Sequence, residues 1–273
     1  MGISLGSVLR LLPRQTKRLA ILDNVIPHEV RPGDKLFTRY FIGSVDGAIA
    51  MSAAVATDWQ RLTQKPVRLL FHPLYDHYGN PLPRAEACAA LGLDPAYRYL
   101  LFFGLIRAYK GLDLLLEAWR SPQLRRFSDV KLLIAGELYE PYDKYRPLLE
   151  APENAHRVIF HEGFVPDEKV QYYFSAADAV VQPYRSATQS GVTQIAYHFE
   201  KPMVVTNVGG LPEMVPDGEV GFVCEAHPAA LTHALERLLA EPVDRFLPAI
   251  RMVKQRFSWT AFVEALLDFA QTL

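Results

Sequence analysis

Short apolar runs alternate along this chain with stretches in which apolar residues recur at helical spacing. The runs predict strands at 19–23, 47–52, 67–72, 98–104, 130–136, 157–161, 178–183, 202–207 and 221–224. The amphipathic stretches predict helices near 35–42, 53–63, 111–120, 142–150, 167–176, 190–199, 211–215, 228–240, 244–256 and 259–272. Strands that alternate with helices form parallel sheets with helices on their faces.

A turn-rich stretch at 73–83 (PLYDHYGNPLP) divides this pattern in two. We expect a first domain at 1–76, a second at 77–257 and a terminal segment at 258–273. The second domain has enough strands for a complete doubly wound sheet, which binds ligands beyond the carboxyl ends of its strands. The first domain has few strands, a small core and an open sheet edge, so we expect strands to be missing from its front.

The composition is that of a soluble globular protein, with 50% hydrophobic and 22% charged residues in a chain of 273. A formal net charge of −1 argues against nucleic acid as a partner and requires any anion site to be local. The chain shows no bilayer-spanning run, no signal peptide and only two cysteines in unrelated segments. We expect a cytoplasmic protein.

The N-terminal segment is basic as well as amphipathic. Arg10, Arg14, Lys17 and Arg18 lie within or just after a helix expected at 3–12. Such a segment suits peripheral contact with the inner face of an anionic membrane. A core-facing first helix with a solvated basic side is the favoured alternative.

The turn after the strand at 98–104 carries the first candidate site residues, Gly104, Arg107 and Lys110. A cation at a helix N-terminus opposes the helix dipole, so a lysine here is unfavourable unless an anion binds beside it. A solvated first-turn lysine is the alternative, but the neighbouring Arg107 favours an anionic ligand. The turn is therefore predicted to hold a phosphate group.

A second turn follows the strand at 178–183 and meets the same sheet edge. Ser190 and Gly191 begin a helix whose unpaired N–H groups suit an anion, and a glycine lets a ligand approach the backbone. Gly209 and Gly210 form a third turn, which is either part of this site or a plain strand-to-helix connection. Together the turns predict a diphosphate site, and we expect a sugar nucleotide as the ligand.

Two further candidates have strong structural alternatives. Gln194 lies in an apolar helix, where a satisfied core amide is common. His28 follows the first strand and is a candidate to meet the acceptor hydroxyl or the sugar, although a loop histidine is more often structural.

Four motifs in order resemble the group 1 family of retaining glycosyltransferases, which has the GT-B fold of two facing Rossmann-like domains. Gly104 is followed by five residues and then Lys110-Gly111, which is similar to the glycine–Lys–Gly turn of the family. The segments 161–165 (HEGFV), 176–183 (AADAVVQP) and 206–213 (TNVGGLPE) resemble its base-side loop, its AD-to-P strand and its GG-x-PE turn. The resemblance implies an α/β, GT-B-like fold with a complete C-terminal Rossmann-like domain and a partial N-terminal one.

The resemblance also implies roles for individual residues. Lys110 and an arginine, assigned here to Arg107, hold the donor diphosphate, while the amides at 190–192 bind its distal phosphate. Glu213 shapes the sugar side, and the loop that carries Phe164 contacts the base. The terminal helix in 258–273 packs back on the N-terminal part.

The chain departs from the family at the Glu-x7-Glu pair, which falls on Ser186 and Gln194. A neutral glutamine can still hydrogen-bond a ribose diol. Leu105 stands where the family commonly has its arginine.

The expected reaction is transfer of a sugar, with retention, from a UDP- or GDP-sugar to a hydroxyl of a saccharide or lipid-linked acceptor. Cations and helix amides would stabilise the leaving diphosphate. The chain has no Asp-x-Asp pair, so we expect no metal and no other cofactor. The alternatives are a non-catalytic sugar-nucleotide-binding or regulatory protein and a sugar-nucleotide epimerase. A dinucleotide oxidoreductase is disfavoured because no strand is followed by G-x-G-x-x-G.

Overall fold

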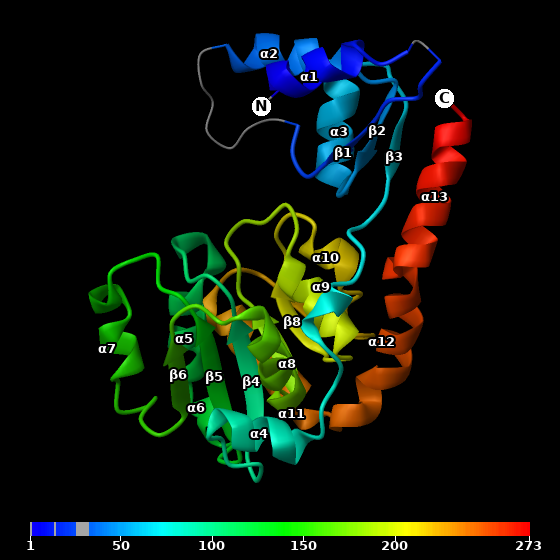
Figure 1. Ribbon diagram of the computed structural model, residues 1–273. Coiled ribbons are helices and arrows are strands. Elements are labelled where there is room, and N and C mark those ends of the chain that lie inside the picture. Colours follow the sequence, from blue (N-terminus) through cyan, green and yellow to red (C-terminus); the bar gives the residue numbers. More distant parts are fainter. Residues whose placement is uncertain (1, 14, 26–32) are drawn as a thin grey trace. The chain divides into compact units, whose positions relative to one another are not determined.

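The predicted strands form two parallel sheets in the computed structural model of the protein, which describes residues 2–13, 15–25 and 33–273 (Figure 1). One sheet has the order β1-β2-β3 and the other the order β6-β5-β4-β7-β8-β9. The chain divides into unit 1, which comprises Met1–Pro73 and Arg256–Leu273, and unit 2, Leu74–Gln255. The expected class, α/β with parallel sheets, is confirmed.

Unit 1 buries apolar side chains on both faces of its sheet. Its strands are β1 (Leu19–Leu22), β2 (Gly47–Ala50) and β3 (Val67–Leu69), and its described helices are α1 (Gly2–Arg10), α2 (Asp34–Ile42), α3 (Ala53–Leu62) and α13 (Trp259–Gln271). On one face Ala48 and Ala50 of β2 belong to a core cluster with Val55 and Trp59 of α3. On the other face the C-terminal helix α13 supplies the cover.

Helix α13 is held to this sheet by apolar packing and an ion pair. Ile49 of β2 belongs to a cluster with Phe262 and Phe269 of α13. Arg68 Nη1 on β3 lies 2.6 Å from Asp268 Oδ2. The last helix of the chain therefore completes the core of the unit that contains the first.

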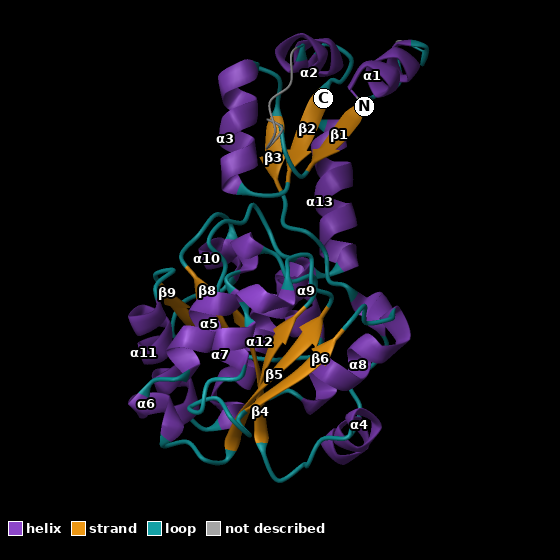
Figure 2. Cartoon of the chain, turned by 90° about the vertical axis from the view of Figure 1, so that its left-hand side faces the viewer, coloured by secondary structure: helices purple, strands orange, loops and turns teal. Residues whose placement is uncertain are grey.

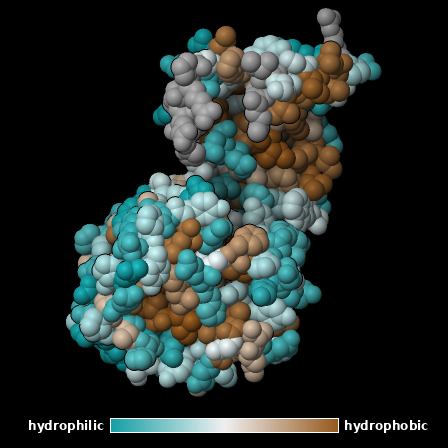
Figure 3. Space-filling view, turned by 60° about the vertical axis from the view of Figure 1, so that its left-hand side comes forward, coloured by the Kyte–Doolittle hydropathy of each residue, from teal (hydrophilic) through white to brown (hydrophobic). Residues whose placement is uncertain are grey.

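Helix α1, which ends in the basic residue Arg10, packs on α2 along one of its sides. Gly6 of α1 approaches Tyr40 of α2, and Leu9 contacts the unit 1 core. Leu5 and Val8 are exposed on 51% and 60% of their surface. Apolar side chains also gather on one face of unit 1 (Figure 3). Contact with a membrane surface stays a prediction.

Unit 2 is a doubly wound domain with helices on both faces of its sheet (Figures 1 and 2). Its strands are β4 (Arg98–Phe103), β5 (Val130–Gly136), β6 (Val158–Glu162), β7 (Ala179–Gln182), β8 (Met203–Thr206) and β9 (Gly221–Cys224). Its α-helices are α4 (Arg84–Leu91), α5 (Leu112–Trp119), α6 (Pro122–Arg125), α7 (Arg146–Leu149), α8 (Asp167–Ala176), α9 (Gly191–His198), α10 (Leu211–Met214), α11 (Pro228–Ala240) and α12 (Leu247–Lys254). The sequence analysis did not predict α4 or α6.

The strand order reverses between β4 and β7, which lie side by side in the middle of the sheet. Successive strands from β4 run outward to β6, and those from β7 run outward to β9. In open sheets of this kind the loops at such a switch point diverge and leave a crevice at the carboxyl edge. The turns after β4 and β7, predicted to hold phosphate, lie at this switch point.

Two glycines allow the loops at this edge to approach each other closely. Gly111 has φ +68°, and a Cβ atom there would lie only 2.0 Å from the carbonyl oxygen of Pro183. Gly209 has φ +53°, and its Cβ would overlap the carbonyl oxygen of Ala187. The loop after β7 is therefore held between the turns that follow β4 and β8.

Replacement of Gly111 by alanine should destabilise unit 2 through this contact. Gly92 is a matched control, because its φ of +67° is nearly the same but a Cβ there would meet nothing within 4 Å. We expect Gly92→Ala to lower the free energy of unfolding by about 1 kcal/mol and Gly111→Ala to lower it by about 2–4 kcal/mol. Urea titration measures both, and equal losses would show that Pro183 yields to the added methyl group.

Candidate functional site

The side chain of Lys110 lies at the switch point, between the turn after β4 and the start of α9. Lys110 is the last residue of the short 3-10 turn η2 (Ala108–Lys110) and is only 8% exposed. A Cβ atom on Gly104 would lie 3.0 Å from Lys110 Nζ and 3.9 Å from Val192 Cγ2 of α9. The structure thus brings together Gly104, Lys110 and the α9 N-terminus, as the sequence predicted.

The ammonium group of Lys110 has no carboxylate partner among the described residues. It makes no hydrogen bond or ion pair with them, and the centroid of the Tyr184 ring lies 5.4 Å from Nζ. Burial lowers the pKa of Lys110 below the usual lysine value, and the positive charge of Arg107 acts in the same direction. Partial removal of a cation from water without a counter-charge is unfavourable, and a bound anion would reduce that penalty.

The first turn of α9 offers two backbone donors beside this cation. Within the described parts of the chain, no acceptor lies on the N–H groups of Gly191 and Val192. Ser190 precedes the helix, but its hydroxyl makes no capping hydrogen bond. Instead Ser190 Oγ lies 3.3 Å from Tyr184 Oη. The arrangement leaves both amides open, as phosphate binding requires.

The room that Gly191 leaves at its Cα is filled by a protein side chain in this structure. A Cβ atom at position 191 would lie 2.6 Å from Cε2 of Tyr75. The sequence suggested that a ligand approaches this backbone closely. In this structure a ligand could approach the N–H groups but not the Cα atom of Gly191.

Arg185 fixes the turn that carries Lys110, and sequence reasoning missed it. Its guanidinium makes a two-point contact with Asp113, with both N–O distances at 2.7 Å. Its backbone N–H donates to the carbonyl oxygen of Tyr109 at 2.6 Å, and Nη1 donates to that of Ala108 at 3.0 Å. Arg185 thus joins the loop after β7 to η2 and to the start of α5. Its place just after the end of a predicted strand was the available signal.

Arg107, Phe164 and Ser186 lie on the exposed rim at the same edge of the sheet. The Arg107 guanidinium lies over the ring of Tyr139, 4.5 Å from its centroid. Phe164 follows β6 and is 70% exposed. These side chains are accessible, and their contacts with phosphate, base and ribose stay predictions.

Gln194 lies in the core, as in its structural alternative, but its amide is not fully satisfied there. It is 1% exposed, and Nε2 lies 3.8 Å from Met214 Sδ, while Oε1 is buried without a hydrogen-bond partner. A ribose could reach this amide only if the α10 turn moved. Glu213 and Gly210 belong to that turn, and Gly209 before it makes room for the backbone of the β7 loop.

The remaining predictions concern parts of the chain away from these turns. His28 lies outside the described residues, so its role stays a prediction. In the described part of the chain, no group of three or more His, Cys, Asp or Glu side chains is placed to hold a metal ion. None of the described helices combines the length and the apolar character needed to cross a bilayer.

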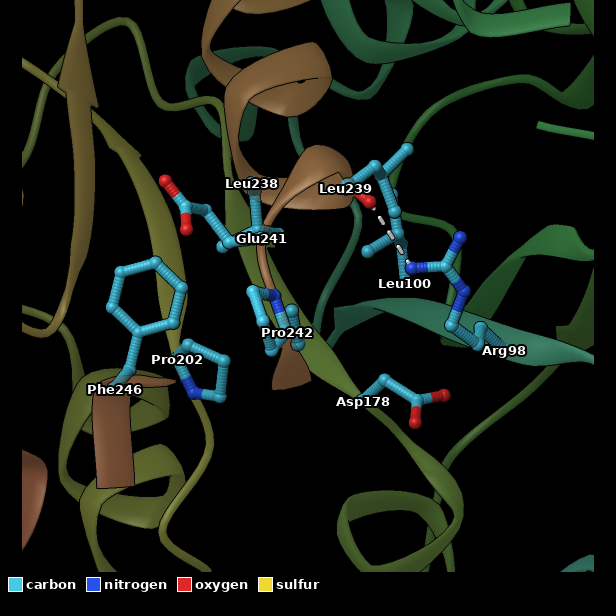
Figure 4. Close-up of a pocket in the computed structure, with 10 residues that line it drawn as sticks. Arg98, Leu100, Asp178, Pro202, Leu238, Leu239, Glu241, Pro242 and Phe246 are labelled. Atoms are coloured by element: carbon cyan, nitrogen blue, oxygen red, sulfur yellow. Dashed lines mark hydrogen bonds between the residues drawn. The ribbon is translucent and has the colours of Figure 1, made fainter. Parts of the chain in front are cut away.

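Two of the other hollows in the structure lie away from these turns. Figure 4 shows one at the opposite, amino-terminal edge of the larger sheet, lined by Arg98, Asp178 and Phe246, with a volume of about 20 Å³. Its space suits about one water molecule. The other lies in unit 1, measures about 470 Å³ and is lined mainly by apolar side chains such as those of Phe37 and Trp59.

Comparison with known families identifies the chain. The family described as "Glycosyl transferases group 1" matches residues 97–241, which include β4, β7, Lys110 and the α9 N-terminus. This chain belongs to the group 1 glycosyltransferase family. The match covers more than half of the 273 residues, so the resemblance seen in the four motifs is confirmed.

Curated relatives are similar over part of their length. The D-inositol 3-phosphate glycosyltransferase of Mycolicibacterium gilvum is 35% identical over 194 residues, which make up 69% of this chain and 42% of that protein. The protein of the same name from Corynebacterium diphtheriae is 31% identical over 198 residues, 66% of this chain and 46% of that one. The chain therefore spans less than half the length of these relatives.

Solved structures share the fold over nearly the whole chain. The sucrose-phosphate synthase of Thermosynechococcus elongatus has a TM-score of 0.76 at 20% identity, covering 99% of this chain and 71% of that one. The HepE protein of Anabaena, solved in complex with UDP, has a TM-score of 0.75 at 16% identity, covering 93% and 72%. The expected GT-B fold class is confirmed.

Removal of the Lys110 charge should have opposite effects on the stability of the ligand-free protein and on its binding of an anion. Lys110→Met keeps the side-chain volume and removes the unpaired charge, so it should raise the free energy of unfolding of the ligand-free protein by about 1–2 kcal/mol. The same change should weaken the binding of inorganic pyrophosphate. Urea titration and calorimetry measure the two effects, and a loss of stability would mean that Lys110 is satisfied within the fold.

The gain should depend on pH with a defined sign. Because the folded-state pKa of Lys110 lies below the usual 10.5, the unfolded chain binds more protons between those two values. Wild-type stability therefore rises with pH in that window, and the advantage of Lys110→Met shrinks there. Lys131→Met is the control, because Lys131 also contacts a tyrosine ring, at 3.9 Å, but is only half-buried. Its stability should change by less than about 0.5 kcal/mol.

Proposed function

We propose that this protein transfers a sugar from a UDP- or GDP-sugar to an acceptor hydroxyl, with retention and without a metal ion. The observation that carries the proposal is the largely buried side chain of Lys110, whose ammonium has no hydrogen-bond partner among the described residues, beside the open amides of Gly191 and Val192. A diphosphate supplies the anionic oxygens that such a group of donors lacks. The whole protein's activity is proposed here from a chain that spans less than half of its curated relatives.

Stabilisation of the leaving group is the proposed contribution of these residues to the reaction. When the bond between the sugar and the diphosphate breaks, negative charge increases on the diphosphate oxygen that leaves. Lys110 and the α9 amides are already oriented by the fold, so they need no reorganisation as the charge develops. Their largely buried position strengthens the interaction relative to water. Arg107, on the exposed rim, adds a second cation at the outer side of the diphosphate.

The choice of donor and acceptor draws on the similar proteins. HepE was solved in complex with UDP-glucose as well as with UDP, which makes UDP-glucose the first donor to test. The curated relatives are named for D-inositol 3-phosphate, which places a phosphorylated polyol beside the saccharide and lipid-linked acceptors in the test panel.

Metal independence is proposed from the donor set of the site. Lys110, Arg107 and the amides of α9 supply positive charge where a metal-dependent enzyme would place a divalent cation held by carboxylates. Asp113, the acidic residue of the first turn of α5, is already paired with Arg185. Binding of the donor should therefore survive EDTA.

A sugar-nucleotide-binding protein without transferase activity is the second candidate. The burial of Gln194 and the serine at position 186 favour it, because the carboxylate pair typical of the family is absent. Both candidates require diphosphate binding, and only the first requires transfer.

Binding is tested by calorimetry with UDP, GDP, uridine and guanosine, in EDTA and then in Mg²⁺. Lys110→Met should weaken diphosphate binding by about ten- to a hundredfold, because hydrogen bonds to charged groups are worth about 1.5–3 kcal/mol. Nucleoside binding should not change. Equal losses for UDP and uridine would place Lys110 away from the phosphates, and a requirement for Mg²⁺ would refute metal independence.

Transfer is tested by incubation with radiolabelled UDP-glucose or GDP-mannose and a panel of polyol phosphate, saccharide and lipid-linked acceptors. We expect a labelled product that has the anomeric configuration of the donor. An inverted product would refute retention. Donor binding with no product from any acceptor would favour the binding protein.

A further inference from the structure

The side chain of Tyr184 contacts both halves of the candidate phosphate site. It stands two residues after the end of β7 and is 3% exposed. Its ring lies beside Lys110 and its hydroxyl beside Ser190. None of the motifs that resemble the family includes it. We propose that Tyr184 is a positioning residue that keeps the Lys110 ammonium and the α9 amides available to a diphosphate. This inference rests on the proposed function.

The ring acts on the cation. Lysine has a flexible four-carbon side chain. The Tyr184 ring is an aromatic contact of the Lys110 ammonium, and Tyr109 also favours the charged form. At 5.4 Å from the centroid, Nζ lies within the range in which an aromatic ring attracts a cation. The ring therefore stabilises the charge at a fixed place while leaving the hydrogen-bond donors of the ammonium free for a ligand.

The hydroxyl acts on the helix end. A serine before a helix ordinarily accepts a hydrogen bond from an N–H group of the first turn, and Ser190 has the extended backbone that such a cap requires. Its side chain does not cap α9 and is paired with Tyr184 Oη instead. With its hydroxyl turned toward Tyr184 Oη, Ser190 does not cap α9, and the first-turn amides stay open to a ligand.

The surroundings of Tyr184 keep it in this arrangement. Its carbonyl oxygen accepts a hydrogen bond from Thr206 Oγ1 at 2.6 Å, and its ring meets that of Tyr109 edge-on at 6.2 Å. Burial raises the pKa of Tyr184 to about 12, so its hydroxyl stays protonated at physiological pH. The side chain is therefore a neutral, fixed group between two parts of the site.

Tyr184→Phe and Tyr184→Leu separate the two actions. The phenylalanine keeps the ring but releases Ser190, so it should weaken UDP and inorganic pyrophosphate binding about three- to tenfold without lowering stability, because Ser190 can then cap α9. The leucine also removes the ring and should weaken binding further, by about tenfold or more in total. Uridine binding should stay unchanged in both. Tyr99→Phe is the control, because Tyr99 is also buried and its hydroxyl also makes one hydrogen bond, at the opposite edge of the sheet.

Double-mutant cycles distinguish positioning from general support of the fold. Tyr184→Phe should have no further effect on pyrophosphate binding when Ser190 is already alanine. When Lys110 is already methionine, Tyr184→Leu should cause little of the loss of pyrophosphate affinity that removal of the ring causes in the wild type. Additive losses in both cycles would overturn the inference.

The outcome also separates this inference from the proposed function. If UDP and GDP bind no more tightly than their nucleosides but pyrophosphate binding depends on Tyr184, the proposed function fails and the positioning role stands. If nucleotides bind and Tyr184→Phe and Tyr184→Leu leave their affinity unchanged, the positioning role is overturned and the proposed function stands. If neither pyrophosphate nor nucleotide binds the wild type, both are overturned.

Discussion

Contacts between loop backbones at the carboxyl edge of the larger sheet determine where the candidate site residues lie. Gly111 packs against the carbonyl oxygen of Pro183, and Gly209 packs against that of Ala187. No other residue fits at these distances with these positive φ angles. The loop after β7 is consequently held from both sides. Because Lys110 directly precedes Gly111, the contact that joins these loops also places its side chain below the surface.

Burial of the Lys110 side chain destabilises its positive charge, and the surrounding residues compensate for this only in part. The ring of Tyr184 attracts the ammonium, but no carboxylate faces it among the described residues. Arg185, which also lies at this edge, has both a carboxylate partner and two backbone carbonyls as acceptors. Arg185, which holds the loops together, therefore has its hydrogen-bond partners within the fold, and Lys110 at the crevice does not. Such a difference between neighbouring cations indicates a ligand.

The sequence predicted the strands well, because each is an apolar run ended by a turn. It missed α4, where only Ala87 and Cys88 are buried, and α6, which has four residues, because neither presents a clear apolar stripe. At the site it found Gly104 and Lys110, whose roles follow from local spacing. It missed Arg185, because the place of that residue just after a predicted strand does not reveal that its partner, Asp113, lies on another crossover. Burial of Gln194 likewise depends on α10, which covers a helix side that periodicity alone does not identify as buried.

The two edges of the larger sheet differ in whether their charged groups and helix ends have partners within the fold. At the amino-terminal edge, the Asp178 carboxylate accepts hydrogen bonds from the Tyr99 N–H and from Arg84, so its charge is compensated. At the carboxyl edge a lysine is buried without a counter-charge, and the serine before α9 does not cap it. Both exceptions meet at Tyr184. Natural proteins break such rules mainly where function requires it. Two open groups that meet at one tyrosine are therefore the arrangement that the proposed anion site requires, and the stability of the sheet does not explain them.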